Sequence, residues 1–256
     1  MGEPNAKAPG AAAPKAHRPP VGQAAGKKVE VERMFDAIAP RYDLLNRVLS
    51  LGIDRGWRKR AVRMAADALE GPPERVLDVA TGTADLAVEA LSMAPAEVVG
   101  VDLSEAMLER GRAKLRARGI GRVTLQKGDA EALPFPDGHF DAALVAFGVR
   151  NFEDLQAGLR EMRRVLRPGG VLVVLELSKP RAFPFRQLYD FYSLKLLPLV
   201  GRLVSGDRGA YTYLPESVRA FPDGAAFLRE LERAGFADRA ERRLTFGVAS
   251  LYRGRA

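Results

Sequence analysis

Acidic residues end short apolar runs at three places in the sequence, and their spacing suggests a shared ligand. Asp78 belongs to the first run, and the small residues that lead from it to Gly82 let the backbone turn sharply and approach a ligand. Asp102 comes about 20 residues after this turn, where an acid can accept hydrogen bonds from both hydroxyls of a ribose. Asp129 follows the third run and can accept a hydrogen bond from an exocyclic amine such as that of adenine. Together the three positions predict a pocket for an adenosine that carries no phosphates.

The turn after Asp78 differs from the best-known nucleotide-binding motifs. The pattern G-x-G-x-x-G of dinucleotide enzymes is incomplete, because only Gly82 is present and Ala84 follows two residues later. A phosphate-binding loop is disfavoured, since no Lys-Ser or Lys-Thr pair follows the turn. Taken alone, the residues also fit a plain strand-to-helix turn, and Asp102 also fits a residue that starts a helix at Ser104.

Strand and helix patterns alternate through the middle of the chain and must position these acids. Short apolar stretches typical of strands fall at residues 75–79, 98–101, 123–126, 140–145 and 171–175. The spacing of apolar residues predicts helices over 84–93, 104–118 and 155–166, the second with Ser104 as its N-cap. This alternation indicates a parallel sheet with helices on both faces, and ligands of such sheets bind at the carboxyl ends of the strands.

The rest of the chain divides by composition. Residues 1–28 hold Ala, Pro, Gly and Lys with almost no large apolar side chain, which predicts a disordered basic tail. We expect 29–256 to form a single domain. Its parts are an N-terminal helical segment over 29–70, a ligand-binding core over 74–180, a lid and substrate region over 181–222, and a C-terminal helix with the last strands over 223–256. Trp57 to Ala68 predict an amphipathic helix, with Arg58 and other arginines on its polar face.

Composition narrows the chemistry. The 256 residues include no cysteine and two histidines, which excludes disulfides, thiolate metal sites and cysteine nucleophiles, and no metal site is expected. The net charge is +8, with a mildly acidic middle between two basic flanks. Such flanks suit nucleic acid, an anionic membrane surface or an anionic substrate, and they also occur as plain solvated surface. The polar N-terminus and the lack of cysteine lead us to expect a cytoplasmic protein.

Several stretches resemble the class I S-adenosylmethionine-dependent methyltransferases. They are the run Val76–Asp85, the triplet Gly100–Asp102, the stretch Gly128–Asp137 and the turn Arg164–Gly170. Further stretches resemble, within that superfamily, the ubiquinone/menaquinone biosynthesis C-methyltransferases. These are Met34–Asn46, Phe147–Asn151, Tyr211–Ser217, Phe221–Pro222 and Leu244–Val248. The resemblance covers roughly residues 29–255.

The resemblance implies a Rossmann-like α/β fold with a seven-stranded, mostly parallel sheet, helices on both faces and a lid insertion. It also implies S-adenosylmethionine as the methyl donor. The residues expected to bind it are Asp78, Gly82, Thr83, Asp102, Asp129, Ala130 and Ala146. Two positions depart from the family pattern. Ala84 replaces a common glycine in a turn where alanine cannot take a positive φ cheaply. Ala146 replaces a frequent serine, so one cofactor hydrogen bond worth about 0.5–1.5 kcal/mol is expected to be missing.

The reaction implied by the resemblance is methyl transfer to a ring carbon of a polyprenylated quinol. The substrate is demethylmenaquinol in the menaquinone branch and a methoxy-polyprenyl-benzoquinol in the ubiquinone branch. Such a carbon becomes nucleophilic when the neighbouring hydroxyl ionises, and Arg150, just past the fourth strand, is well placed to stabilise that phenolate. We expect Asn151 to hold the local turn, and the resemblance alone adds Asp43 and Tyr211 as candidate quinol contacts.

Other functions stay open from the sequence. A related methyltransferase that acts on another small hydrophobic phenol or lipid fits the same residues, and so does a non-catalytic module that only binds S-adenosylmethionine. No nucleic-acid partner is expected, because cytosine C5 methylation uses a cysteine and the tetrad of amino methyltransferases is absent after the fourth strand. The glycine pattern disfavours an NAD-dependent oxidoreductase.

An apolar stretch over 188–204 bears on membrane contact. Lys195, Pro198 and Arg202 interrupt it, so it is too broken to span a bilayer. It fits either a core helix or a lid over a polyprenyl tail that also touches the membrane surface. Together with the basic flanks, it leads us to expect peripheral contact with the anionic inner face of the membrane. The sequence leaves open whether the chain forms a homodimer and which ring it methylates.

Overall fold

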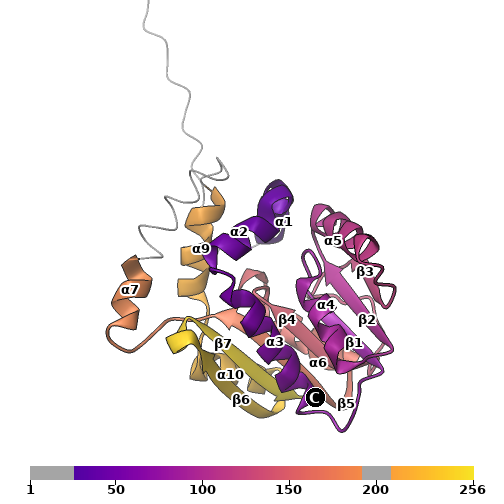
Figure 1. The fold of residues 1–256 in the computed structure, drawn as a ribbon. Helices are drawn as coiled ribbons and strands as arrows, with labels where there is room; N and C mark the ends of the chain where they lie inside the picture. Colours follow the sequence, from indigo (N-terminus) through magenta and orange to yellow (C-terminus); the bar gives the residue numbers. More distant parts are fainter. Residues whose placement is uncertain (1–25, 192–208) are drawn as a thin grey trace, which may run out of the picture.

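The computed structural model of the chain describes residues 26–191 and 209–256 (Figure 1). Within them, seven strands form one sheet in the order β3-β2-β1-β4-β5-β7-β6. The strands are β1 (Arg75–Val79), β2 (Glu97–Asp102), β3 (Val123–Lys127), β4 (Phe140–Ala146), β5 (Leu166–Leu177), β6 (Ala237–Leu244) and β7 (Ala249–Arg255). β1 to β5 run parallel, whereas β7 runs antiparallel to its neighbours β5 and β6. The predicted seven-stranded, mostly parallel sheet is therefore confirmed.

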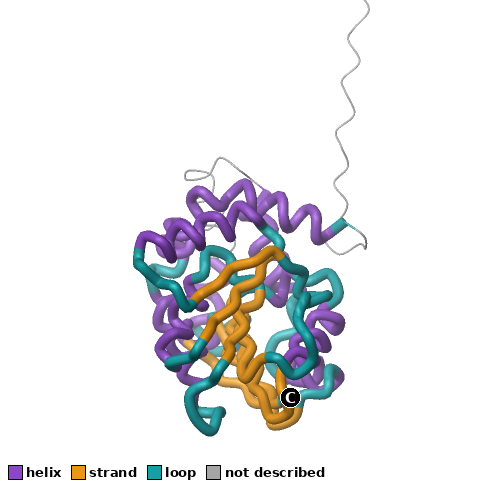
Figure 2. Tube along the Cα trace, turned by 90° about the vertical axis from the view of Figure 1, so that its right-hand side faces the viewer, coloured by secondary structure: helices purple, strands orange, loops and turns teal. Residues whose placement is uncertain are grey.

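Helices cover both faces of the sheet (Figure 2). They are α1 (Lys27–Ile38), α2 (Tyr42–Leu49), α3 (Ile53–Ala66), α4 (Asp85–Ala90), α5 (Glu105–Ala117), α6 (Leu155–Val165), α7 (Phe185–Phe191), α9 (Gly209–Ala220) and α10 (Ala225–Arg233), with 3₁₀ turns at Ala39–Arg41, Leu91–Met93, Val149–Asn151 and Thr245–Gly247. α3, α4 and α5 pack on one face, and α6 and α10 pack on the other. α1 and α2 lie across one end of the sheet (Figure 1).

Side chains of the central strands alternate between two cores, one on each face. Val76 contributes to the core that contains Trp57 of α3, whereas its neighbour Leu77 contributes to the core shared with α6 and α10. Val173 and Val174 of β5 divide in the same way. Because both faces are covered, these strands are continuously apolar, as is typical of a parallel sheet.

Capping residues begin two helices near the carboxyl edge of the sheet. Ser104 Oγ accepts a hydrogen bond from the Met107 N–H at 3.1 Å, which confirms the predicted N-cap of α5. The side chain of Asp154 caps α6 in the same way, accepting from the Ala157 N–H at 2.9 Å. Each such cap typically contributes about 1 kcal/mol. These caps fix where the helices begin next to the strand ends that carry the candidate ligand groups.

Two features differ from the sequence expectations. α1 begins at Lys27, so the last two residues of the predicted tail belong to a helix that contacts the sheet edge; residues 1–25 lie outside the described residues. Arg58, predicted on the polar face of α3, is buried because Asp54 at 2.6 Å and Asp85 at 3.3 Å compensate its charge. Within the lid predicted over 181–222, residues 192–208 lie outside the described residues, so the lid stays a prediction.

No helix among residues 26–191 and 209–256 combines the length and the apolar character needed to cross a bilayer. The same residues contain no cluster of three or more histidine, aspartate or glutamate side chains placed to hold a metal ion.

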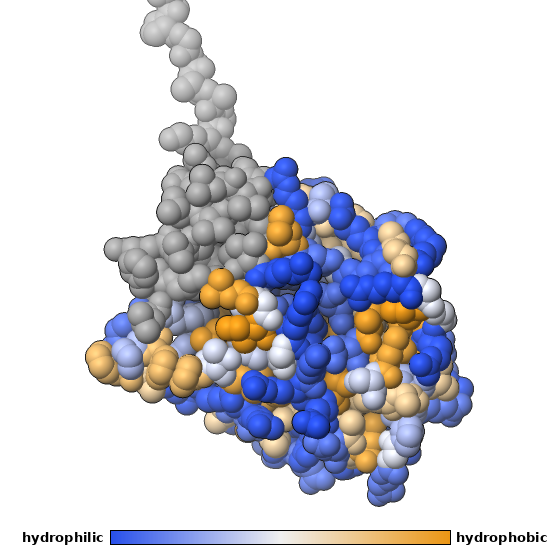
Figure 3. All heavy atoms as spheres, in the orientation of Figure 1, coloured by the Kyte–Doolittle hydropathy of each residue, from blue (hydrophilic) through white to orange (hydrophobic). Residues whose placement is uncertain are grey.

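The surface between α7 and α9 is basic and partly apolar. A hollow there is lined by Lys179, Pro180, Arg181, Arg186, Tyr189, Pro215, Val218, Arg219 and Asp223. Phe183, next to these residues in sequence, is 80% exposed. Phe246, which stacks on Phe185 of α7, is 68% exposed. Figure 3 shows apolar spheres around α7 next to hydrophilic ones. Exposed aromatic side chains beside cations are typical of a surface that contacts a partner.

Candidate active site

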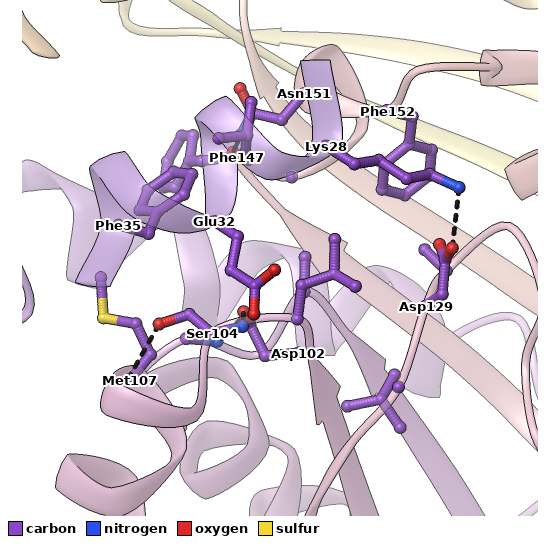
Figure 4. Close-up of a pocket in the computed structure, with 18 of the residues that line it drawn as sticks. Lys28, Glu32, Phe35, Asp102, Ser104, Met107, Asp129, Phe147, Asn151 and Phe152 are labelled. Atoms are coloured by element: carbon purple, nitrogen blue, oxygen red, sulfur yellow. Dashed lines mark hydrogen bonds and ion pairs between the residues drawn. The ribbon is translucent and has the colours of Figure 1, made fainter. Parts of the chain in front are cut away.

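The carboxyl ends of β1, β2 and β4 and the loop after β3 surround a cavity, which α1 and α2 cover. From α1, Lys28, Glu32 and Phe35 extend into it (Figure 4). The other lining residues are Val31, Tyr42, Ala80, Gly82, Val101, Asp102, Leu103, Ser104, Met107, Gly128, Asp129, Ala130, Glu131, Ala146, Phe147, Gly148, Asn151 and Phe152. The cavity therefore lies at the strand ends where the sequence predicted a ligand.

Small residues in left-handed backbone conformations build the turn after β1. The φ angle is +54° at Ala80, +55° at Gly82 and +67° at Ala84. The left-handed region costs a non-glycine residue about 1–2 kcal/mol, so Ala84 holds the strained conformation that its sequence position implied. Below the turn, Thr81 Oγ1 donates a hydrogen bond to Asp78 Oδ2 at 2.6 Å. Burial raises the pKa of Asp78 to about 7, although the bond from Thr81 opposes this shift.

Asp102, at the end of β2, joins this turn to α5. Its Oδ2 accepts a hydrogen bond from the Gly82 N–H at 2.8 Å, and its Oδ1 accepts one from the Ser104 N–H at 2.9 Å. Burial raises the pKa of Asp102, and the hydrogen bonds from Ser104 and Gly82 oppose that shift. Because each carboxylate oxygen has a second lone pair, the side chain retains the capacity to accept hydrogen bonds from a ribose.

α1 crosses the cavity above Asp129 and is fixed there by its first two residues. Lys28 Nζ lies 2.7 Å from Asp129 Oδ2 and 2.8 Å from Glu131 Oε2 (Figure 4). Partial burial lowers the pKa of Lys28, but the bonds to the two carboxylates outweigh it and raise the pKa to about 12. Lys27 Nζ donates to backbone carbonyls of the segment after β4. These contacts close one end of the cavity.

The structure brings most of the predicted cofactor residues to one wall. Those that line the cavity are Gly82, Asp102, Asp129, Ala130 and Ala146. Asp78 and Thr83 are not among the lining residues, and their expected contact with the methyl donor stays a prediction. Thr83 Oγ1 donates to Asp43 Oδ1 at 2.6 Å and accepts from Lys114 Nζ at 3.0 Å, so its side chain is used behind the turn.

The four predicted catalytic residues occupy different positions. Asn151 lines the cavity. Asp43 does not line the cavity. Its Oδ1 accepts from Thr83 Oγ1 and its Oδ2 lies 2.8 Å from Lys114 Nζ, so both oxygens already have partners. Tyr211 belongs to α9, but its side chain lies outside the described part of the structure. Arg150 lies beside the cavity in the network described next.

Arg150 is buried in an ion pair at one corner of the cavity. Its Nη1 lies 2.8 Å from Glu176 Oε1, and the two side chains are 8% and 0% exposed. Nη1 also donates to the carbonyl of Phe147, to which Asn151 Nδ2 donates at 3.3 Å. Asn151 Oδ1 in turn accepts from Tyr213 Oη at 3.0 Å. This network links β4, β5 and α9 around the wall residues Phe147 and Asn151.

Among the residues that sequence reasoning did not single out are Lys28, Tyr42, Glu176 and Tyr213, although Tyr42 and Tyr213 lie in stretches that carry the resemblance. Glu176 had a further usable signal, since it directly follows the apolar strand 171–175 and a carboxylate at that strand end faces the ligand edge. Lys28 had no signal because the surrounding composition is that of a tail.

The cavity fits the adenosine part of S-adenosylmethionine. Asp102 and Asp129 provide acceptors for hydroxyls and for an amine, and both reach the cavity wall. Val101, Leu103 and Ala130 place apolar surface between them, which suits the faces of a flat base. The turn at Gly82 brings backbone rather than side chain to the same wall.

Solved structures share this architecture. An S-adenosylmethionine-dependent methyltransferase from Thermotoga maritima, described as a possible histamine N-methyltransferase, has a TM-score of 0.59 at 20% identity, covering 87% of this chain and 98% of that chain. The [4+2]-cyclase SpnF has a TM-score of 0.59 at 26% identity, covering 84% of this chain and 75% of that chain. Because the fold serves such different reactions, it does not by itself decide the reaction.

Sequence relatives are more specific. The demethylmenaquinone methyltransferase of Deinococcus radiodurans is 51% identical over 93% of this chain and 97% of the relative. The protein of the same name from Thermus thermophilus is 53% identical over 86% of this chain and 99% of the relative. The ubiquinone/menaquinone biosynthesis C-methyltransferase of Geobacter sulfurreducens is 48% identical over 89% of both. Residues 23–256 match the ubiE/COQ5 methyltransferase family, and the chain belongs to that family.

Proposed function

We propose that this chain transfers the methyl group of S-adenosylmethionine to a ring carbon of a polyprenylated quinol. The observation that carries the proposal is identity of 51% and 53%, over most of the chain, to two proteins named for demethylmenaquinone methylation. We therefore infer demethylmenaquinol as the substrate. A methoxy-polyprenyl-benzoquinol is the second candidate, because the Geobacter relative is named for both quinone pathways.

The cavity residues divide the work of holding the methyl donor. We assign Asp102 to the ribose hydroxyls and Asp129 to the adenine amine, with Gly82, Ala130 and Ala146 forming the small-residue wall between them. Asp78 and Thr83 hold the turn in place from behind. When bound, S-adenosylmethionine supplies a methyl group that is already activated on a sulfonium.

The residues of the chain must make the quinol nucleophilic. A phenol has a pKa of about 10, so holding it ionised at neutral pH requires about 4 kcal/mol. One or two charge-assisted hydrogen bonds, at about 1.5–3 kcal/mol each, supply that stabilisation. We assign one of these bonds to Arg150, which lies next to the wall residues Phe147 and Asn151 and whose Nε–H has no acceptor among the described residues. The ring carbon then takes the methyl group, and the hydrogen on that carbon leaves as a proton.

Residues around Arg150 orient the ring. Asn151 and Tyr213 are joined at 3.0 Å and bring α9 against the turn after β4, which fixes one side of the substrate region. Tyr211 precedes Tyr213 on the same helix and stays a candidate for contact with the quinol. We assign Asp43 to holding Thr83 and Lys114 rather than to the ring.

The surface between α7 and α9 is proposed to rest on an anionic membrane from the cytoplasmic side. Cations line its hollow, and Phe183 and Phe246 stand exposed near it, which suits a surface that meets acidic headgroups and the upper acyl region. Binding to vesicles of phosphatidylglycerol should exceed binding to phosphatidylcholine vesicles and fall with salt. Equal binding to both kinds of vesicle at low salt would remove the electrostatic part of this proposal.

The decisive experiment is a methyl-transfer assay on the full chain. Short-chain forms of demethylmenaquinol and of the methoxy-benzoquinol are incubated in parallel with labelled S-adenosylmethionine, and the label is located in the product by mass spectrometry. We expect ring-carbon methylation of the naphthoquinol. Labelling of the benzoquinol alone would reassign the substrate. Binding of S-adenosylmethionine without transfer to either quinol would favour a binding module.

A further inference from the structure

We propose that Glu176 is a positioning residue, which fixes the guanidinium of Arg150 and compensates its charge beside the site of a cationic methyl donor. The proposal rests on the proposed function, in that it takes S-adenosylmethionine as the donor. It assigns a role to a residue that contacts neither the quinol nor the donor and acts through Arg150.

The geometry holds the carboxylate of Glu176 rigidly at the end of β5. Its Oε1 accepts from Arg150 Nη1 at 2.8 Å and from the Leu177 N–H at 2.8 Å. Its Oε2 faces the Arg150 N–H at 3.4 Å. The side chain is 0% exposed, so water does not compete for these bonds. A carboxylate fixed in this way determines where the guanidinium of Arg150 lies.

The arrangement also leaves a defined donor on Arg150. Its Nη1 is used by Glu176 and by the carbonyl of Phe147. Its Nε–H is buried and has no acceptor within the described parts of the chain. Buried donors are usually paired, so a fixed, unpaired one next to wall residue Phe147 is suited to a ligand.

Charge gives the second half of the argument. Arg150 lies near enough to the wall residue Tyr42 for its charge to affect that phenol: burial raises the pKa of Tyr42, and the hydrogen bond with Asn46 and then the charge of Arg150 oppose the rise. A sulfonium is a cation, so a buried arginine near it would repel the donor unless a carboxylate compensates the charge. In the described structure Glu176 is the acid paired with the guanidinium. Among the described residues, the pair therefore carries one unpaired donor, the Nε–H of Arg150, beside the wall residues Phe147 and Asn151, and it has no net charge.

Stability alone is a weaker reason for the pair. Removing two charges from water is costly, and apolar residues of similar volume commonly replace buried ion pairs without loss of stability. Burial raises the pKa of Glu176, and the charge of Arg150 opposes that shift, as expected where desolvation is costly. A function for the compensated guanidinium accounts for this cost.

Arg150 and Glu176 differ in how their charge changes when the other residue is replaced, and this difference allows a test. Arginine stays protonated, so Glu176→Gln leaves an uncompensated buried cation. In Arg150→Met, the remaining buried Glu176 can take a proton and become neutral. The double variant, Glu176→Gln with Arg150→Met, has neither charge. Only Glu176→Gln thus adds net charge beside the donor.

The experiment compares S-adenosylmethionine with S-adenosylhomocysteine by calorimetry, because the second ligand lacks the sulfonium charge but shares the adenosine and the amino acid. For Glu176→Gln, we expect the ratio of the two Kd values to shift about tenfold against S-adenosylmethionine. Arg150→Met and the double variant should keep the parent ratio within about twofold. Glu161→Gln, which removes a carboxylate from an ion pair on α6, is the matched control. Glu176→Asp should keep the ratio and lower turnover, since the charge stays while the guanidinium moves.

Each outcome decides. If Glu176→Gln lost affinity equally for both ligands, its role would be in packing and the proposal would be overturned. Turnover of Glu176→Asp equal to that of the parent would also overturn it. If Glu176→Gln fails to fold, a folded double variant with the parent ratio supports charge compensation, and failure of both variants to fold overturns it. Failure of the parent chain to bind S-adenosylmethionine would instead refute the proposed function, so the two failures are distinguishable.

Discussion

Lys28 Nζ lies 2.7 Å from Asp129 Oδ2, and this bond joins α1 to the loop after β3 across 101 residues of sequence. Asp129 is also the residue we assign to the adenine amine. The same carboxylate therefore holds the covering helix and lies where the methyl donor is expected. Glu131 adds a second ion pair to Lys28 at 2.8 Å. Because Asp129 serves both contacts, we expect the position of α1 and the binding of the methyl donor to affect each other.

The first prediction concerns Lys28→Met. Loss of two partly buried ion pairs weakens the closure of α1 by about 1 kcal/mol, so S-adenosylmethionine should dissociate about fivefold faster. Stopped-flow competition with unlabelled ligand measures the rate. Arg233→Met, which removes an exposed ion pair on α10, is the control and should leave the rate unchanged. A dissociation rate equal to that of the parent in Lys28→Met would separate α1 from cofactor retention.

The second prediction concerns Asp102→Asn. The new amide places a donor where the Gly82 and Ser104 N–H groups need acceptors, and it weakens acceptance from a ribose. We expect affinity for S-adenosylmethionine to fall at least about tenfold. The variant should also lose most of the preference for 5′-methylthioadenosine over its 2′,3′-dideoxy analogue. An unchanged preference would show that other residues hold the ribose. Asp137→Asn, which removes an exposed carboxylate, is the control and should keep the parent affinity.

The fold was largely predictable from sequence because its signals are local. Alternating apolar strands and amphipathic helices placed β1 to β4 within one residue, and Ser104 indicated the start of α5. The predicted fifth strand, 171–175, was too short, because β5 begins at Leu166 and includes the residues predicted as the preceding turn. The acids Asp102 and Asp129 were also predictable, since they follow strand ends that a parallel sheet brings to one edge.

The remaining parts of the site depend on contacts between distant residues. No local pattern indicates that Lys28 reaches Asp129, or that Thr83 turns away from the cavity toward Asp43. Likewise, Arg58 has the spacing of a surface residue, and only its pairing with Asp54 and Asp85 explains its burial. Such pairings follow from tertiary packing, which one sequence does not encode at short range.

The third prediction is a pH dependence of stability caused by Asp78. Burial raises its folded-state pKa to about 7 from the ordinary 3.8, so on raising the pH the unfolded chain releases this proton first. The protonated side chain contributes to the free energy of unfolding; this contribution is fully present below about pH 4 and is lost as the pH rises to about 7. Relative to Asp78→Asn, the parent should lose free energy of unfolding, on the order of a few kcal/mol, across that range. Urea denaturation of both proteins at several pH values measures it, and parallel curves would contradict the shift.

The last prediction is catalytic and concerns Arg150→Met. The substitution keeps the length of the side chain and removes the charge and the donors that we assign to the phenolate. Turnover should fall at least tenfold, because about 1.4 kcal/mol of lost transition-state stabilisation already amounts to that factor. Affinity for S-adenosylmethionine should stay near the parent value, since Asp102 and Asp129 remain in place. Turnover should recover in part at alkaline pH, where a quinol with a pKa of about 10 ionises unaided. Measuring turnover from neutral to alkaline pH tests both statements. Full turnover of the variant at neutral pH would remove Arg150 from the chemistry and direct attention to the tyrosines of α2 and α9.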